Sequence, residues 1–334
     1  MDLEKSSSSE TGNMFKSRVD LAELQDAVQR MRTEIGKVII GQEAVLDLLI
    51  TALLADGHVL IEGVPGVAKT LTAKLLARTF NVEYSRIQFT PDLMPSDVLG
   101  TSIFNQKGGE FEFRKGPVFS NIVLIDEINR APAKTQAALF EAMEERQITM
   151  DGTTYKLDAP FIVLATQNPI EQEGTYRLPE AQLDRFIFKV TVDYPSLSEE
   201  EQIIRGHHER KSALPLEMVQ QVMSREKIAE FRGKVREIHV EDKLIAYIAR
   251  LVHDTRDNQS LYLGASPRAS IAILNGAKAM AAIRGRDFVT PEDIREITLP
   301  VMVHRVILTP EREMEGLKTA DIIKEIIQKI EVPR

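Results

Sequence analysis

The sequence predicts an α/β core built on a parallel β-sheet, followed by an all-α domain. Three observations lead to this prediction. Short, continuous apolar runs alternate with helical stretches as far as about residue 195. Two glycine-containing stretches with turn signals interrupt this alternation and indicate β-hairpin insertions. From residue 198 onward, apolar residues recur at helical spacing almost throughout.

Five apolar runs are the predicted strands of the sheet. They are "HVLIE" (58–62), "YSRIQF" (84–89), "NIVLID" (121–126), "FIVLATQ" (161–167) and "RFIFKV" (185–190). Continuous apolar runs of this kind, separated by helices, are typical of strands that are covered on both faces. Such strands form parallel sheets.

The elements around these strands follow from local signals. Residues 20–36 carry apolar positions at helical spacing behind Asp20, a suitable N-cap, and a second helix follows them. The turns "KGGE" and "MDGT" lie within the predicted hairpins 100–117 and 146–160. Later helices are expected to start at Ser198 and at Thr290-Pro291-Glu292.

The composition predicts an ordinary water-soluble protein. Of the 334 residues, 43% are apolar, 28% are charged and none is cysteine, which excludes disulfides and thiolate metal sites. The net charge of −8 counts against general binding of nucleic acid. No run approaches the roughly 18 apolar residues of a membrane span. We therefore expect a cytoplasmic protein with a disordered tail (1–17), an α/β core (18–195) and an all-α domain (196–334).

The stretch "EGVPGVAKT" connects the first predicted strand to a helix and resembles a phosphate-binding loop. Ala68 stands where Gly-x-x-x-x-Gly-Lys-Thr has its last glycine, which costs little if the φ of Ala68 is negative. Lys69 would neutralise the β- and γ-phosphates, and the Thr70 hydroxyl would bind Mg²⁺. An ordinary strand–turn–helix corner with a surface lysine is the alternative. The predicted nucleotide-binding residues here are Gly63, Val64, Pro65, Gly66, Val67, Ala68, Lys69, Thr70 and Leu71.

Polar residues follow two of the apolar runs, where open α/β sheets bind their ligands. In "NIVLIDEINRAP", Asp126 would hold Mg²⁺ through water, and Glu127 would orient or deprotonate the attacking water. The alternative is an Asp-Glu pair that caps the next helix. In "FIVLATQNP", Asn168 could reach the γ-phosphate or the water, and an Asn-Pro turn is the alternative.

Two arginines are candidates for phosphate contacts. Arg185, at the start of a strand in "LPEAQLDRFIFKV", cannot easily reach its own subunit's phosphates, so we predict an arginine finger that acts on a neighbouring subunit. Arg130 is the rival candidate for this role. Arg268, in "GASPRAS", stands near a helix start and could contact nucleotide. A local Asp184–Arg185 ion pair and a solvated Arg268 are the alternatives.

In this order, these stretches resemble the AAA+ ATPases, and specifically the MoxR family of the helix-2-insert clade. "EGVPGVAKT" resembles the Walker A motif of that family, and "VLIDEINRAP" resembles its Walker B motif. "ATQNPIEQEGTYRLPEAQLDRF" resembles its sensor 1 and arginine-finger region, and "GASPRAS" resembles its sensor 2. The resemblance covers roughly residues 20–310 and implies a P-loop NTPase core with an all-α lid domain.

The resemblance also implies an activity and partners. MoxR proteins are ATPases that use ATP and Mg²⁺, assemble as homo-oligomeric rings, typically hexamers, and act as chaperone-like factors. They remodel or mature protein complexes, often with a partner that carries a von Willebrand factor A domain. "VIIGQ" stands where AAA+ proteins contact adenine, which makes Ile39, Ile40 and Gly41 candidates. Arg268 would act on the nucleotide of its own subunit or on that of a neighbour.

Two other functions stay open at this stage. A DNA-engaging AAA+ motor would use basic residues of its hairpins, but acidic residues offset those present here, which favours protein contacts and makes nucleic acid an unexpected partner. A magnesium-chelatase-like ATPase subunit would share the fold and the type of partner. The basic candidates on the hairpins are Lys107, Arg114, Lys115, Arg146 and Lys156.

Overall fold

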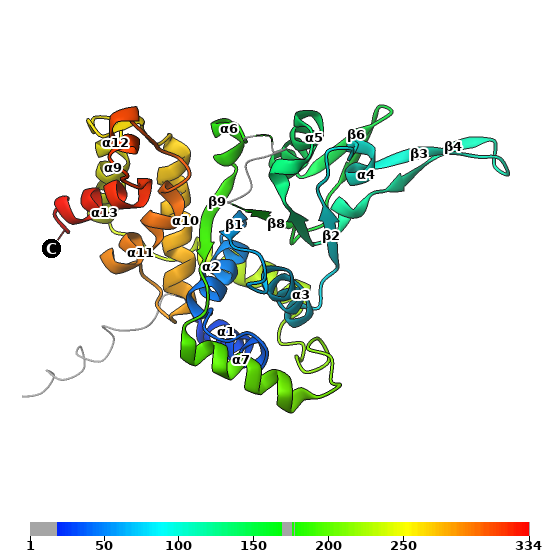
Figure 1. Ribbon diagram of the computed structural model, residues 1–334, viewed down its shortest axis with the longest axis horizontal. Coiled ribbons are helices and arrows are strands. Elements are labelled where there is room, and N and C mark those ends of the chain that lie inside the picture. The colour runs from blue at the N-terminus through cyan, green and yellow to red at the C-terminus, as the bar shows by residue number, and fades with distance from the viewer. Residues whose placement is uncertain (1–18, 169–175, 177, 334) are drawn as a thin grey trace, which may run out of the picture.

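The computed structural model describes residues 19–333 except 169–175 and 177, so the predicted tail over 1–17 lies outside the described residues. At its centre lies a five-stranded parallel sheet with the order β2-β5-β8-β1-β9 (Figure 1). The predicted parallel sheet is thus confirmed. Its strands are β1 (His58–Gly63), β2 (Tyr84–Gln88), β5 (Ile122–Asp126), β8 (Ile162–Gln167) and β9 (Phe186–Val192).

Helices cover both faces of this sheet, as its continuous apolar strands require. Leu124 and its neighbours on one face belong to an apolar cluster with α1, α2, α3 and helices of the C-terminal part. Ile125, on the other face, belongs to a second cluster with α4 and α5. These helices are α1 (Ala22–Gly36), α2 (Glu43–Leu54), α3 (Lys69–Phe80), α4 (Pro95–Leu99) and α5 (Ala133–Glu145).

Both predicted hairpins are confirmed, and they contact each other. The first is β3 (Gly100–Asn105) with β4 (Glu110–Lys115), and it projects from the body of the protein (Figure 1). The second is β6 (Gln147–Met150) with β7 (Thr153–Lys156). The Ser102 hydroxyl of the first donates a hydrogen bond to Asp151 of the second. The rings of Phe113 and Tyr155 stack with their centroids 4.4 Å apart, so the two insertions form one unit.

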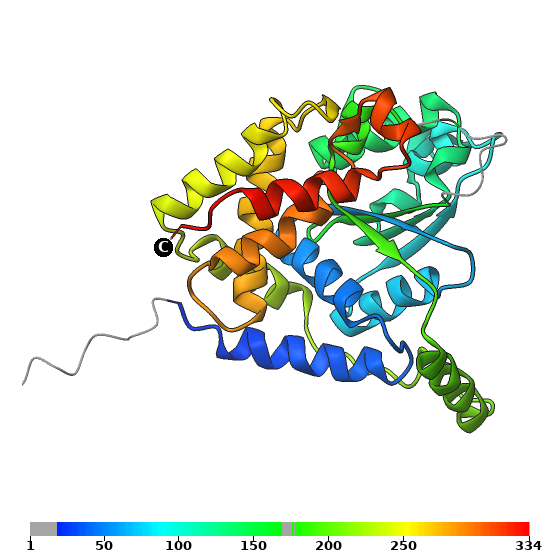
Figure 2. The same ribbon diagram turned by 60° about the vertical axis from the view of Figure 1, so that its left-hand side comes forward.

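After β9 the chain is almost entirely helical, and α1 lies beside these C-terminal helices (Figure 2). One feature was not predicted: β10 (Leu261–Leu263) and β11 (Ile307–Leu308) pair as a short antiparallel sheet. The first helix of this part is capped by Ser196 and not by Ser198, because the Ser196 hydroxyl accepts the Glu199 N–H. The helices are α7 (Leu197–Arg210), α8 (Arg225–Arg236), α9 (Asp242–Asp254), α10 (Pro267–Ile283), α11 (Pro291–Met302), α12 (Pro310–Met314) and α13 (Thr319–Lys329).

The change from strands to helices falls between β9 and α7, close to the predicted domain boundary at 195/196, which stays a prediction. A single apolar cluster includes Leu24 of α1, Phe188 of β9 and Ile273 of α10. The C-terminal helices therefore pack directly on the N-terminal helices and on β9, an outermost strand of the sheet. None of the described helices is long and apolar enough to cross a membrane.

A buried histidine joins three elements where the strands begin. The term edge is used from here on for either end of the sheet along its strands: one edge where the strands begin and one where they end. His58 Nδ1 accepts the backbone N–H of Val163 at 2.9 Å, so Nε2 carries the proton and donates to the carbonyl of Met143 at 3.2 Å. Burial, together with the charge of Arg146, lowers the pKa of His58 to about 3. The imidazole is therefore neutral in the folded protein.

This buried histidine predicts a loss of stability in mild acid. Below its usual pKa of 6.5, His58 takes up a proton in the unfolded chain but not in the folded protein. Between about pH 6.5 and 3, each unit of acidification should therefore lower the free energy of unfolding by roughly 1.4 kcal/mol through this residue. His58→Gln should have the correspondingly flatter dependence in urea titrations at pH 7 to 4. The exposed His208→Gln is the matched control, and equal slopes for His58→Gln and the parent protein would contradict the assignment.

Candidate active site

The predicted phosphate-binding loop connects β1 to α3 at the edge of the sheet where the strands end. Gly66 has a φ of 89°, and Ala68 lies in the left-handed region with φ 58° and ψ 17°. The condition under which Ala68 would cost little, a negative φ, is therefore not met. The loop keeps the backbone that glycine would adopt, and the methyl group makes this conformation cost about 1–2 kcal/mol. Backbone strain of this kind is often found at functional sites.

Lys69 is the first residue of α3, and its side chain folds back over the loop. Its Nζ donates to the carbonyl oxygen of Gly63 at 2.6 Å. Burial lowers the pKa of Lys69, whereas the carboxylates of Asp126, Glu127 and Glu62 oppose this shift. The ammonium thus lies in the field of Asp126, the predicted magnesium ligand, and of Glu127, the predicted catalytic carboxylate, and a phosphate would offer it an anionic partner in place of a carbonyl.

Asp126 and Thr70 lie together, as a magnesium site requires. The Thr70 hydroxyl is 3.5 Å from Asp126 Oδ2, and the Thr166 hydroxyl donates to Asp126 Oδ1 at 3.2 Å. Within the described parts of the chain, no group of three or more Asp, Glu, His or Cys residues could hold a metal. One carboxylate and one hydroxyl suit Mg²⁺, which usually binds one or two protein oxygens together with phosphates and water. The residues present therefore fit a magnesium ion that arrives with a nucleotide.

Arg86 of β2 neutralises this carboxylate, a contact that the sequence analysis missed. Its Nε donates to Asp126 Oδ2 at 2.6 Å. The hydrogen bond and charge of Asp126 raise the pKa of Arg86, against a smaller opposing effect of burial. The alternation of "YSRIQF" places Arg86 and Gln88 on the same side of the strand beside β5, which is the signal that could have indicated them.

Glu127 follows β5, and its own backbone is in the left-handed region with a φ of 58°. Its N–H donates to the Thr166 hydroxyl at 3.0 Å. Its Oε2 accepts from Gln88 Nε2 at 2.7 Å and lies 3.1 Å from Arg130 NH1. The carboxylate is therefore held by side chains. It makes no capping hydrogen bond to the 3-10 helix Ile128–Arg130, at whose N-cap Glu127 stands, and the N-cap of α5 is Pro132. Arg130, the rival arginine finger, lies beside the catalytic carboxylate predicted in its own subunit.

Asn168 comes directly after β8, which lies between β5 and β1 in the sheet. It is half-buried. Because β8 and β5 are parallel and in register, with Ala165 opposite Ile125, Asn168 lies at the same edge as Glu127. This position suits its predicted contact with the γ-phosphate or the attacking water, and that role stays a prediction.

A cavity of about 360 Å³ lies beside the loop and fits an adenine base. The predicted Ile39, Ile40 and Gly41 line it, together with part of the loop. The φ of Gly41 is 75°, which favours glycine, whereas the Glu199 carboxylate that a methyl group would meet is the end of a flexible side chain. The sequence analysis missed the lining residues that come from the segment after β9. These are Tyr194, Pro195, Glu199, Ile203 and Arg210.

Arg185 lies at the opposite edge of the sheet, where the strands begin. It precedes β9, whose Phe186 pairs with His58 at the start of β1, whereas Val192 pairs with Gly63 at its end. The seven residues of β9 span roughly 20 Å. This distance separates Arg185 from the loop of its own subunit and exceeds the length of an arginine side chain.

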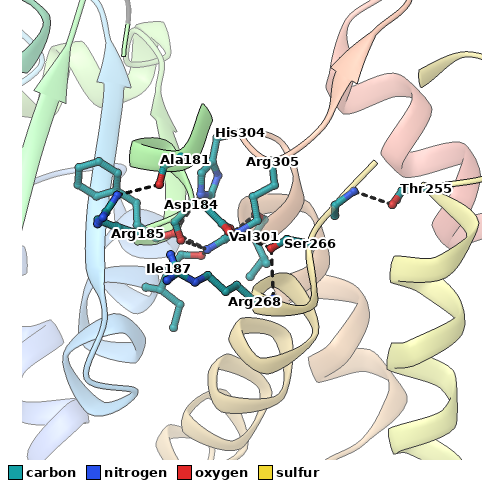
Figure 3. A network of polar contacts seen from close by, with 12 residues as sticks. Ala181, Asp184, Arg185, Ile187, Thr255, Ser266, Arg268, Val301, His304 and Arg305 are labelled. Atoms are coloured by element: carbon teal, nitrogen blue, oxygen red, sulfur yellow. Dashed lines mark hydrogen bonds and ion pairs between the residues drawn. The ribbon is translucent and has the colours of Figure 1, made fainter. Parts of the chain in front are cut away.

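Arg268, at the start of α10, lies at this same edge (Figure 3). Both arginines bind Glu144, the penultimate residue of α5: Arg185 NH2 lies 2.6 Å from its Oε2, and Arg268 NH2 lies 2.7 Å from its Oε1. Among the described contacts the Asp184–Arg185 ion pair is not seen, whereas Arg268 is exposed, as its alternative expects. Asp184 pairs with the buried Arg305 at 2.6 Å, and Arg268 has an ionic partner.

Comparison with known proteins identifies two regions of this architecture. Residues 58–188 match the ATPase family associated with various cellular activities (AAA), and residues 253–326 match the AAA lid domain. The chain is 42% identical to the chaperone MoxR1 of Mycobacterium tuberculosis, over 92% of this chain and 82% of that protein. It is 29% identical to the protein MoxR of Methylorubrum extorquens, over 94% of this chain and 97% of that protein.

A solved structure shares the whole fold. It comes from Cytophaga hutchinsonii and is provisionally described as an ATPase. The two chains are 44% identical and superimpose with a TM-score of 0.86. The match covers 93% of the present chain and 97% of the solved one.

The left-handed Ala68 predicts an order of stability among variants. Ala68→Gly removes the strain of about 1–2 kcal/mol but adds backbone entropy of about 0.4–1 kcal/mol to the unfolded chain, so a net gain of about 0.8 kcal/mol is expected. Ala68→Val should be less stable than the parent protein, because β-branched residues rarely adopt positive φ. Urea unfolding without nucleotide measures this order. A valine variant as stable as the parent would show that the left-handed conformation is not required.

Proposed function

The chain belongs to the MoxR family of AAA+ ATPases, and from this premise we propose that it hydrolyses ATP with Mg²⁺ as a homo-oligomeric ring, typically a hexamer, to remodel or mature protein complexes. One observation supports the oligomeric part most strongly. The predicted phosphate-binding and water-activating groups lie at one edge of the sheet, and the two predicted phosphate-contacting arginines lie at the other. A single subunit cannot bring both sets to one nucleotide.

At the first edge, the loop N–H groups and Lys69 would bind the triphosphate, because a helix N-terminus and an ammonium both favour phosphate oxygens. Thr70 and Asp126 would hold the magnesium ion, which supplies Lewis-acid stabilisation of the phosphoryl oxygens when bound. Arg86 donates to Asp126 Oδ2, the oxygen nearest the Thr70 hydroxyl, so Arg86 and a magnesium ion held through water would share this carboxylate.

Glu127 is the best placed general base of this site. Gln88 and Arg130 hold its carboxylate at the edge of the sheet, and Asn168 follows the neighbouring strand. Glu127 would accept the proton of the attacking water, with Asn168 orienting that water or the γ-phosphate. A base held by two side chains loses little freedom when the reaction begins, which favours catalysis.

Arg185 and Arg268 would both act on the nucleotide of a neighbouring subunit. Both bind the carboxylate of Glu144 and therefore lie close together. A neighbour's nucleotide that comes within reach of one arginine is thus also within reach of the other. An arginine supplied by a neighbour makes hydrolysis depend on assembly, because the developing negative charge lacks this cation in an isolated subunit.

The paired hairpins are the proposed surface for protein clients. Phe104 and Phe111 lie opposite each other across the first hairpin, and they are 51% and 73% exposed. Exposed aromatic side chains of this kind suit protein contacts, and the family resemblance supports a partner with a von Willebrand factor A domain. DNA binding that weakened steeply with salt would instead favour the DNA-motor alternative.

The proposed site predicts two different defects. Lys69→Ala should abolish nucleotide binding, because the loop loses its cation. Glu127→Gln should bind ATP but hydrolyse it about 10²–10⁴ times more slowly, because the water loses its base. Titration with a fluorescent ATP analogue and release of phosphate measure the two steps separately.

Two exposed residues of the neighbouring helices serve as controls for these variants: Arg78→Ala on α3 and Glu141→Gln on α5 should behave as the parent protein. Hydrolysis at the parental rate by Glu127→Gln would refute the assignment of the general base, and unchanged ATP affinity in Lys69→Ala would refute that of the phosphate site.

A further inference from the structure

Two cations converge on one carboxylate at the edge of the sheet where the strands begin. Arg185 donates to Glu144 Oε2 through Nε at 2.8 Å and lies 2.6 Å from it through NH2. Arg268 donates to Glu144 Oε1 through NH2 at 2.7 Å. The two guanidinium groups are therefore close enough to bind the two oxygens of a single anionic group. A phosphoryl group presents oxygens in a similar arrangement, which arginine recognises in the same bidentate manner.

Glu144 is the carboxylate that neutralises the two arginines, because the other nearby carboxylate, Asp184, has different partners. Asp184 lies nearby, but it accepts hydrogen bonds from Arg305 at 2.6 Å and from Ser266 at 2.9 Å (Figure 3). Burial would raise the pKa of Glu144, but Arg185 and Arg268 together lower it below its usual value, so the carboxylate stays ionised. The cluster borders a cavity of about 350 Å³, which leaves room for a phosphoryl group.

The contact with Glu144 also occupies the groups that a phosphate would need. The Nε and NH2 groups form the side of Arg185 that binds an anion in a bidentate manner, and both are used. Its NH1 donates to the carbonyl of Ala181 at 2.9 Å. Arg185 in this arrangement cannot bind a neighbour's phosphate through that side unless Glu144 is displaced.

We propose that Glu144 is a place-holding anion, which neutralises Arg185 and Arg268 in a free subunit and gives way to the triphosphate of a neighbouring subunit on assembly. This inference rests on the proposed action of the two arginines across a subunit interface. It adds that Glu144 competes with the neighbour's triphosphate for the two arginines and so weakens the association of subunits. The triphosphate displaces Glu144 because it carries more negative charge than one carboxylate, and Glu144 then becomes free to meet solvent.

The competition predicts a gain of association when the charge of Glu144 is removed. Glu144→Gln keeps the size of the side chain but loses the charge that binds the arginines. Two partly exposed ion pairs contribute modestly, so ATP-dependent association should occur at protein concentrations about twofold to thirtyfold lower. Sedimentation velocity with saturating ATP measures this midpoint in a Glu127→Gln background, where hydrolysis does not consume the ligand. Without ATP, the midpoint should not move.

Glu145→Gln is the matched control, because Glu145 is the next residue of α5, is exposed and carries the same charge. It should leave the midpoint unchanged. A supporting role for Glu144, in which it positions the arginines for catalysis, predicts the opposite result. An unchanged or raised midpoint in Glu144→Gln, with association of the background protein intact, would overturn the place-holding role and leave the proposed function standing.

Failure of the proposed function has a different signature. If the Glu127→Gln protein did not associate in ATP at any concentration, the assembly itself would be refuted, and the role of Glu144 with it. Association in ATP that is equally strong in Arg185→Ala and Arg268→Ala backgrounds would also overturn the inference, because the arginines would then not contact the neighbour's nucleotide.

Discussion

All five strands of the central sheet run in the same direction, and this constraint decides what one subunit can do. All five strands end at the same edge of the sheet. Lys69, Asp126 and Glu127 therefore lie together there, around the proposed nucleotide site. Every strand start lies at the other edge, which carries Arg185. The length of the strands separates the two sets of groups. In the proposed function, each edge therefore carries half of a catalytic site, and a neighbouring subunit would join the two halves.

Helix α5 links these two edges within one subunit. It begins just after the loop that follows Glu127 and ends beside Glu144, which binds Arg185 and Arg268. The same region is held in place by the buried contacts of His58 and of Arg305.

The sequence was sufficient for the elements that depend on local pattern. Apolar runs indicated the strands, turn residues indicated the hairpins, and motif spacing indicated Lys69, Thr70, Asp126 and Glu127. The contacts that no local pattern contains were missed, because they join residues far apart in the chain. Gln88 meets Glu127, and Glu144 meets Arg268 across 124 positions. The φ of Ala68 could not be read from the sequence for another reason: its positive value goes against the preference of alanine, so no local propensity indicates it.

The central claim is that each nucleotide site is completed by a neighbouring subunit, and mixing two inactive variants tests it most directly. Arg185→Ala should be nearly inactive, since an arginine finger contributes about 10³–10⁵ in rate, and Glu127→Gln should be inactive for lack of its base. When subunits exchange, some interfaces combine the intact Glu127 of one variant with the intact Arg185 of the other. The account predicts that the mixture hydrolyses ATP, with a maximum at an intermediate ratio. Mixed rings that form and stay inactive at every ratio would contradict it.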